Sequence, residues 1–223
     1  MTVAAQTIIK RVAYLLHDPS SVRWTVGELV SYLNAAQNEM AVYRPDAFAT
    51  TATLALTAGA KQSLPSGATK LIGVVRNTSG AKRAVRPVKK ALLDAQNPEW
   101  YSSAGSDEVV HYMYDERDPK TFYVYPPATS SSSVEITYAG LPTLLTEPGS
   151  GTFADVTGNI TVSDHFANAL GDYVMYRAFS KDADFANDAS RAAAYYTAFA
   201  NAVGIEVKAT TTVAPAGATT TGA

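Results

Sequence analysis

The chain has 223 residues, with 18 Lys and Arg against 20 Asp and Glu, so its formal net charge is −2. That length suits one substantial domain or two small ones, and the near balance of charge argues against a dedicated nucleic-acid-binding protein, which is usually basic. Cysteine is absent, which excludes disulfides, thiolate nucleophiles and cysteine-based zinc sites. Only 17% of the residues are charged, so the surface either exposes much Ser, Thr and Ala or is covered by partners.

The first 45 residues predict two helices. The first helix carries apolar residues at helical spacing, namely Ile8, Val12 and Leu15 or Leu16. It ends before Pro19, because the residue that precedes a proline avoids the α region. Thr25 and Glu28 form a capping-box pattern that starts the second helix, which stops before Pro45. One face of this second helix is apolar and consists of Val26, Leu29, Leu33, Ala36 and Met40.

The middle of the chain predicts short strands, at residues 47–57, 70–76, 82–88, 109–114, 121–125 and 134–138. The most specific pattern is a hairpin, in which two β-rich runs flank a polar turn that ends in Asp118-Pro119. We expect Pro126 and Pro127 to end this hairpin. We also expect a turn at 63–67 and a short helix at 91–100 that crosses one end of the strands.

Residues 159–207 predict two further helices. Ser163 is a suitable N-cap for the first of them, and a stripe follows from Phe166, Leu170, Tyr173 and Arg177. The second helix carries a narrow seam of heptad type, which we expect to pack against other helices of the same subunit. This seam consists of Phe185, Ala189, Ala192, Tyr196, Phe199 and Val203, and Gly204 supplies a stop. Residues 180–184 are either a break or a bend.

The expected fold is therefore α+β: a helical bundle made by the N- and C-terminal helix pairs, with an inserted small antiparallel β-sandwich or barrel. In the expected domain division, residues 1–45 and 159–207 together form the helical domain. Residues 46–158 form the β module, and residues 208–223 form an extended tail rich in Thr and Ala. No apolar run is long enough for a membrane span, and Lys10 and Arg11 interrupt the first apolar stretch, so we expect no membrane contact and no signal peptide.

No common catalytic motif is present: the sequence lacks G-x-G-x-x-G, a Walker loop, G-x-S-x-G and H-E-x-x-H. The Gly/Ser loop at 149–152 lacks the helix directly behind it that a phosphate cradle requires. A catalytic base at His111 would need a nucleophile and a carboxylate beside it, and Asp115 alone is weak support for such a site. The carboxylates of the hairpin loop, Asp115, Glu116 and Asp118, do not have the spacing of a calcium-binding loop. We therefore expect no catalytic residue, no cofactor and no metal site, and hence no enzyme.

Charge is unevenly distributed along the middle of the chain. Between residues 70 and 90 there are seven basic residues and no acid, namely Lys70, Arg76, Lys82, Arg83, Arg86, Lys89 and Lys90. Between residues 94 and 118 there are seven acids and one base. These runs are either two solvated faces of the β module, or they reflect charge complementarity between subunits or a basic surface that faces a polyanion.

The last fifteen residues, 209–223, contain no charge and include six threonines and five alanines. Such a segment cannot form a folded unit alone, but β-branched threonines suit strand addition to an exposed sheet edge. It is therefore either an end without a role or a tail that docks on a partner. The residues that we expect to dock are Thr210, Thr211, Thr212, Val213 and Pro215.

Three segments, 26–40, 112–127 and 166–199, occur in an order that resembles the head-to-tail adaptor (connector) proteins of tailed bacteriophages. In that family a helical pair, an inserted β module and a long C-terminal helical region build a ring, typically of twelve copies, beneath the portal. The resemblance implies a structural, non-catalytic virion protein at the head–tail junction that is made in the host cytoplasm.

The partners that the resemblance implies are the portal protein, tail or nozzle proteins and other copies of the chain. Genomic DNA would pass through the channel of the ring without sequence-specific binding. A tail-completion or tail-tube component of the same kind of virion is the alternative.

Overall fold

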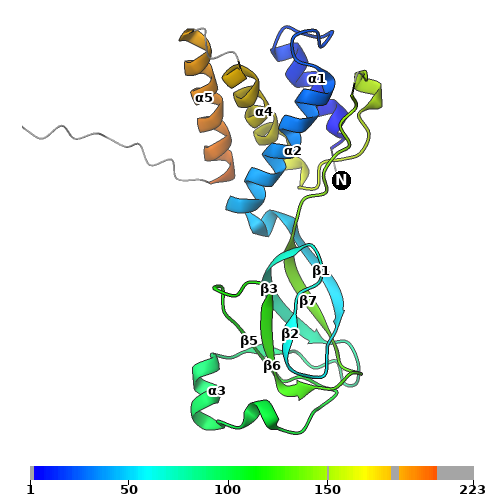
Figure 1. Cartoon of the computed structure of the whole chain (residues 1–223), viewed down its shortest axis with the longest axis vertical. Helices are drawn as coiled ribbons and strands as arrows, with labels where there is room; N and C mark the ends of the chain where they lie inside the picture. The colour runs from blue at the N-terminus through cyan, green and yellow to red at the C-terminus, as the bar shows by residue number, and fades with distance from the viewer. Residues whose placement is uncertain (1–2, 150, 182–185, 205–223) are drawn as a thin grey trace, which may run out of the picture.

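The computed structural model describes residues 3–149, 151–181 and 186–204. The molecule is elongated, with four long helices at one end and a β module at the other (Figure 1). The long helices are α1 (Ala5–Leu15), α2 (Val26–Tyr43), α4 (Ala167–Lys181) and α5 (Ala186–Val203). The α+β class is confirmed, and both expected helix pairs are present.

The apolar face predicted for α2 is confirmed, since all five of its residues are buried in the core that the helices share. In α1, Leu16 is buried as expected whereas Leu15 is 54% exposed. In α5, Ala192, Phe199 and Val203 are buried, but Ala189 is exposed, so the seam is shorter than predicted. Phe185 lies outside the described residues.

The helix boundaries follow from local chemistry. The Thr25 hydroxyl accepts a hydrogen bond from the Glu28 backbone N–H, as the capping-box pattern predicts. Ser163 occupies the predicted N-cap position, before the short helix η4 (Asp164–Phe166) that leads into α4, but its hydroxyl makes no capping hydrogen bond and instead contacts the His165 ring at 2.9 Å. Gly204 adopts φ +79°, the left-handed conformation that ends helices.

The described strands form two sheets. The first has the order β1-β7-β3, with β1 at Ala49–Ala55, β7 at Ser133–Gly140 and β3 at Ala68–Asn77. The second has the order β2-β6-β5-β4, with β2 at Gly59–Ser63, β6 at Thr121–Ala128, β5 at His111–Tyr114 and β4 at Arg86–Pro87. Both sheets contribute to one apolar cluster, which contains Leu71, Val74 and Ile136 from the first sheet and Phe122 and Val124 from the second.

Two expectations for the β module need correction. The strands pair antiparallel except for β4 and β5, which are parallel, so the second sheet is mixed. The described strands also stay in two separate sheets and do not close into a barrel. A short helix, α3 (Lys90–Gln96), lies at the far end of the module, as predicted (Figure 1).

The hairpin is confirmed, since His111 pairs with Tyr125 and Tyr114 pairs with Phe122. As predicted, the hairpin pairing ends directly before Pro126 and Pro127, although strand β6 itself continues to Ala128, which pairs with β2. These prolines are tolerated because the pairing with β5 already ends at Tyr125 and the register with β2 is interrupted nearby. The missing proline N–H groups are therefore not needed by a neighbouring strand.

The segment after β7 returns to the helices. Leu145, Val156, Ile160 and Val162 are buried in the helical core. Asn34 of α2 holds this segment: its Nδ2 donates to the Leu145 carbonyl at 2.9 Å, and its Oδ1 accepts from the Leu145 N–H at 2.8 Å. The described residues thus form one core among the helices and another between the sheets, and the β module also has a smaller apolar cluster around Trp100 and Leu93 of α3.

Candidate functional site

All seven residues of the basic run lie in the β module, and four of them form ion pairs within it. These pairs are Lys70–Glu116 at 2.8 Å, Arg76–Glu135 at 2.6 Å, Lys90–Asp94 at 2.8 Å and Arg83–Glu108 at 3.9 Å. Three of the four acids belong to the acidic run between residues 94 and 118. The fold therefore brings much of the basic run against the acidic run inside one subunit.

The Lys90–Asp94 pair has a defined environment at the start of α3. The hydrogen bond to Asp94 raises the pKa of Lys90. The hydrogen bond from Lys90, and then that from the Trp100 ring N–H, lower the pKa of Asp94. The Lys90 ammonium also lies 5.4 Å from the centroid of the Tyr101 ring, a distance at which a cation and an aromatic face attract each other. This lysine is held in place by its own subunit.

Lys82, Arg86 and Lys89 are exposed, and no ion pair joins them to an acid in the part of the chain that the structure describes. They follow one another along the segment between β3 and α3, with Arg86 on the edge strand β4. Lys82 has φ +53°, in the left-handed region. These three cations are the part of the basic run that has no ion-pair partner among the described residues. The predicted docking residues 210–213 and 215 lie outside the described residues.

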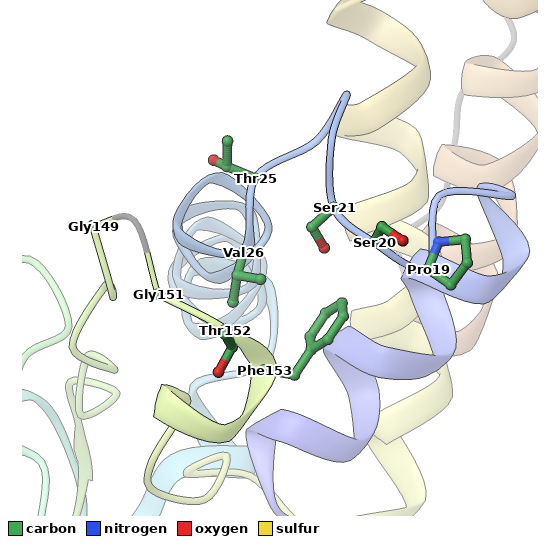
Figure 2. A pocket seen from close by; sticks show the side chains of 9 residues that line it. All are labelled: Pro19, Ser20, Ser21, Thr25, Val26, Gly149, Gly151, Thr152 and Phe153. Carbon is green, nitrogen blue, oxygen red and sulfur yellow. The ribbon is translucent and has the colours of Figure 1, made fainter.

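A cavity of about 550 Å³ opens beside the N-terminus of α2 (Figure 2). It lies between the α1–α2 loop and the segment around Gly149 and Gly151, and its described polar side chains are the hydroxyls of Ser20, Ser21, Thr25 and Thr152. These lining residues include no carboxylate, imidazole or amine. They therefore supply no acid–base pair for catalysis, and the glycine loop is followed only by the three-residue helix η3 (Phe153–Asp155).

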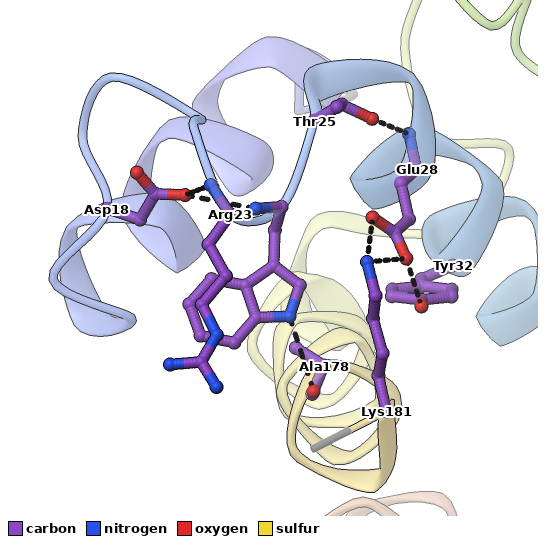
Figure 3. A network of polar contacts seen from close by, with 8 residues as sticks. Asp18, Arg23, Thr25, Glu28, Tyr32, Ala178 and Lys181 are labelled. Atoms are coloured by element: carbon purple, nitrogen blue, oxygen red, sulfur yellow. Dashed lines mark hydrogen bonds and ion pairs between the residues drawn. The ribbon is translucent and has the colours of Figure 1, made fainter.

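A polar network lies next to this cavity and ties the loop and α2 to α4 (Figure 3). Asp18 accepts backbone N–H groups of residues 22, 23 and 24 at 2.8–3.0 Å, and the Trp24 ring N–H donates to the Ala178 carbonyl at 3.3 Å. Glu28 accepts from Tyr32 at 2.7 Å and pairs with Lys181 at 2.9 Å. These contacts are satisfied within the subunit, so the network has a structural role.

The remaining chemistry is sparse. No group of three or more histidine, aspartate or glutamate side chains among the described residues could hold a metal ion. His111 is half-buried on β5, and His165 contacts its neighbours Ser163 and Phe166. Within the described chain, no helix has the length and apolar character needed to cross a membrane.

Exposed apolar side chains were not identified from the sequence. Val22 is 83% exposed, Val42 is 74% exposed, and further exposed apolar residues are Tyr14, Leu15, Ile72, Val75, Leu92, Val110, Leu141 and Leu144. Val42 falls off the apolar stripe of α2, which is a sequence signal for its exposure. Leu15 was one of two alternatives for the stripe of the first helix, and Leu16 is the buried one. Single exposed apolar residues are common on protein surfaces, and a contact surface requires several of them side by side.

The comparison with known families covers nearly the whole chain. A family model described as SU10 adaptor protein matches residues 1–221. A comparison with curated proteins found no match. The family match spans both the helices and the β module, so the likeness extends to the whole arrangement and does not depend on a single local motif.

Proposed function

The chain belongs to the SU10 adaptor protein family, a family of phage head-to-tail adaptors, and from this premise we propose that it forms a ring beneath the portal. In this role it joins the DNA-filled head to the tail and leaves a channel through which the DNA passes. Its partners are the portal protein, tail or nozzle proteins and other copies of itself. The family match along nearly the whole chain is the observation that carries this proposal.

The surface chemistry supports a structural role. The family is one of structural adaptors, which supports the expectation that the chain is not an enzyme. An adaptor has to bind several proteins, and the exposed apolar side chains on both the helices and the β module provide area for such contacts.

We further propose that Lys82, Arg86 and Lys89 are the basic residues that face a partner or the DNA. The other four cations of the run are engaged with acids of their own subunit. A ring repeats each unpaired charge around its axis. Lys82, Arg86 and Lys89 of all subunits would together build a strongly positive zone on the ring. Contacts of this kind attract phosphates without reading sequence.

The test is attachment of the purified chain to portal-bearing heads that lack the adaptor. We expect the free chain to sediment as a monomer or weak oligomer and to form a ring, visible by electron microscopy, only on the portal. A stable dimer that ignores the portal contradicts the proposal. Binding to isolated tail tubes but not to heads identifies a tail-completion or tail-tube component instead.

A further inference from the structure

The four edge strands of the β module differ in how they are protected. An unprotected edge presents free backbone N–H and C=O groups to any extended chain, and proteins commonly block it with charges, prolines, bulges or short length. The edge strand β4 has only two residues and includes Pro87. The edge strand β2 carries Lys61 and an irregular register. The edge strand β3 carries Lys70 and Arg76 and has three register shifts.

The fourth edge, that of β1, has none of these features. Its seven residues, ATTATLA, contain no charge and no proline, and they pair with β7 in an uninterrupted register from Ala49 to Ala55. No described strand pairs with the other side of β1. The strand is mostly exposed. Its threonines favour β structure, and Thr51 contacts Thr137 of β7 across the ladder at 3.1 Å. This edge is therefore open for an added strand.

The chain itself contains a matching segment. Residues 209–214, ATTTVA, have the composition of β1, and Pro215 after them lacks the N–H that would continue a ladder. The segment starts five residues after Gly204, a span of about 17 Å when extended at roughly 3.3 Å per residue. An uncharged, β-branched strand is the type of chain that adds to a sheet edge through backbone hydrogen bonds.

The tail leaves the helices close to the start of β1, and the arrangement of copies decides which copy's edge it meets. The C-terminal end of α5 is fixed near the start of η1 (Pro45–Phe48), since the Arg44 guanidinium donates to the Val203 carbonyl at 3.2 Å. In Figure 1 this end of α5 lies on the left of the molecule, whereas β1 lies on the right of the β module. In a ring of identical copies, opposite sides of the subunit face each other. A ring that brings these two sides together would place the departure point of the tail beside the β1 edge of the next copy.

We propose that residues 209–214 of one copy add as a strand to the β1 edge of the next copy in the ring. This inference rests on the proposed function, because it requires that copies stand side by side. The contact is head-to-tail, and each subunit gives a strand on one side and receives one on the other. Main-chain hydrogen bonds along the ladder supply the affinity, and the threonine pairs set the register.

The absence of native cysteine makes the test direct. Two single-cysteine proteins, Thr53→Cys in β1 and Thr211→Cys in the tail, are mixed and treated with a short bismaleimide, both alone at high concentration and on portal-bearing heads. The expected product is a cross-linked dimer that contains one chain of each variant. The matched control replaces Thr53→Cys by Lys61→Cys on the protected edge of β2, for which the dimer is not expected.

The outcomes separate this contact from the proposed function. Lack of the mixed dimer under both conditions overturns the inference, even if the wild-type protein attaches to heads. A Thr53→Cys/Thr211→Cys double variant that links only within one chain also overturns it. If the wild-type protein does not attach to heads, the proposed function fails, whereas a mixed dimer in the free protein still supports the contact. The last variant, Thr53→Cys/Ala52→Lys, puts a charge on the β1 edge. We expect it to form no mixed dimer with the Thr211→Cys protein.

Discussion

At the scale of single residues, buried amide side chains hold the segment that follows the β module against the helices. Asn34 makes two hydrogen bonds to the backbone of Leu145, and the Gln37 Oε1 accepts from the Thr161 N–H at 2.8 Å. Both amides lie on the buried side of α2, beside its apolar stripe. A buried backbone N–H or C=O group that loses its hydrogen-bond partner does not regain water. The folded state is then destabilised by the cost of removing that group from water. These two side chains therefore fix where the segment that follows the β module packs against α2.

We expect Asn34→Ala to lower the free energy of unfolding by about 2–3 kcal/mol, because it leaves the N–H and C=O of Leu145 without partners. Urea unfolding measures this change. Asn38→Ala is the matched control, since Asn38 is exposed on the same helix and gains the same helix propensity. We expect the control to stay within about 0.5 kcal/mol of the wild type. Equal effects at both positions would show that the Leu145 contact contributes nothing to stability.

Asp18 predicts an acid-dependent loss of stability. Burial raises its pKa, but the backbone N–H donors of residues 22–24 outweigh this effect, so the pKa lies below its ordinary value of 3.8. The contribution of Asp18 is therefore complete above pH 3.8 and disappears as the pH falls through the lower pKa of the folded state. We expect the stability difference between the wild type and Asp18→Asn to be constant near neutral pH and to shrink below pH 3.8. Urea unfolding across this range checks it, and a difference that grows on acidification would contradict it.

The residue scale was only partly predictable from the sequence. The positions of Asn34 and Gln37, next to the apolar stripe of α2, indicated burial. Their partners could not be predicted, because these are backbone groups more than 100 residues away. The same holds for the basic run: the sequence showed complementary charges, but which lysine meets which acid depends on how β3 and the hairpin loop are placed in the fold.

At the scale of elements, α5 packs on α4 through a short apolar and aromatic seam. The Phe199 ring centroid lies 5.0 Å from that of Tyr173, and Tyr196 lies 5.0 Å from Tyr176. Ala192 is 5% exposed, and its small size lets the two helices approach closely. The buried part of the predicted seam thus packs inside one subunit, as expected.

Ala192→Glu should be severely destabilising, because it places an unpaired carboxylate in this contact at a cost of several kcal/mol. Ala189→Glu, on the exposed side of the same helix, should change stability by no more than about 0.5 kcal/mol. Thermal unfolding followed by circular dichroism measures both. A normally stable Ala192→Glu variant that fails only in ring assembly would place this seam between subunits.

The strands show where pattern reading succeeds and where it fails. The hairpin was predictable, because two β-rich runs flank a polar turn and all the pairing is local. The strand β2 was missed, since its sequence, GAKQS, has no apolar alternation. Its buried residues are Ala60 and Gln62, and the Gln62 amide hydrogen-bonds the backbone of Thr57 and Gly59. A polar side chain that is satisfied by the backbone leaves no hydrophobic signal in the sequence.

At the scale of the whole molecule, two cores are joined by two short connections, one through η1 and the other after Gly140. The predicted domain division stays a prediction, but the burial of Leu145 and Val156 among the helices favours a β module that ends near Gly140 and not at residue 158. Composition could not reveal this, because residues 141–158 are rich in loop-forming residues wherever they pack. We propose that the two units unfold separately.

The two tryptophans allow this proposal to be tested, since Trp24 is buried in the helical core and Trp100 in the β module. We compare core substitutions in two backgrounds, Trp100→Phe and Trp24→Phe, in which fluorescence reports only on the helices or only on the β module. Phe122→Ala removes a fully buried ring between the sheets and should cost about 3–5 kcal/mol. We expect it to lower the urea midpoint reported by Trp100 and to leave that reported by Trp24 nearly unchanged.

The reciprocal substitution completes the argument. Leu33→Ala empties a fully buried position in the helical core and should cost about 2–5 kcal/mol. It should lower the midpoint reported by Trp24 and spare that reported by Trp100, because few side chains are shared between the two cores and units joined in this way behave as separate domains. If either substitution moves both midpoints together, the chain unfolds as one cooperative unit. The β module would then be a fixed extension of the helices, unable to adjust its position independently when copies assemble.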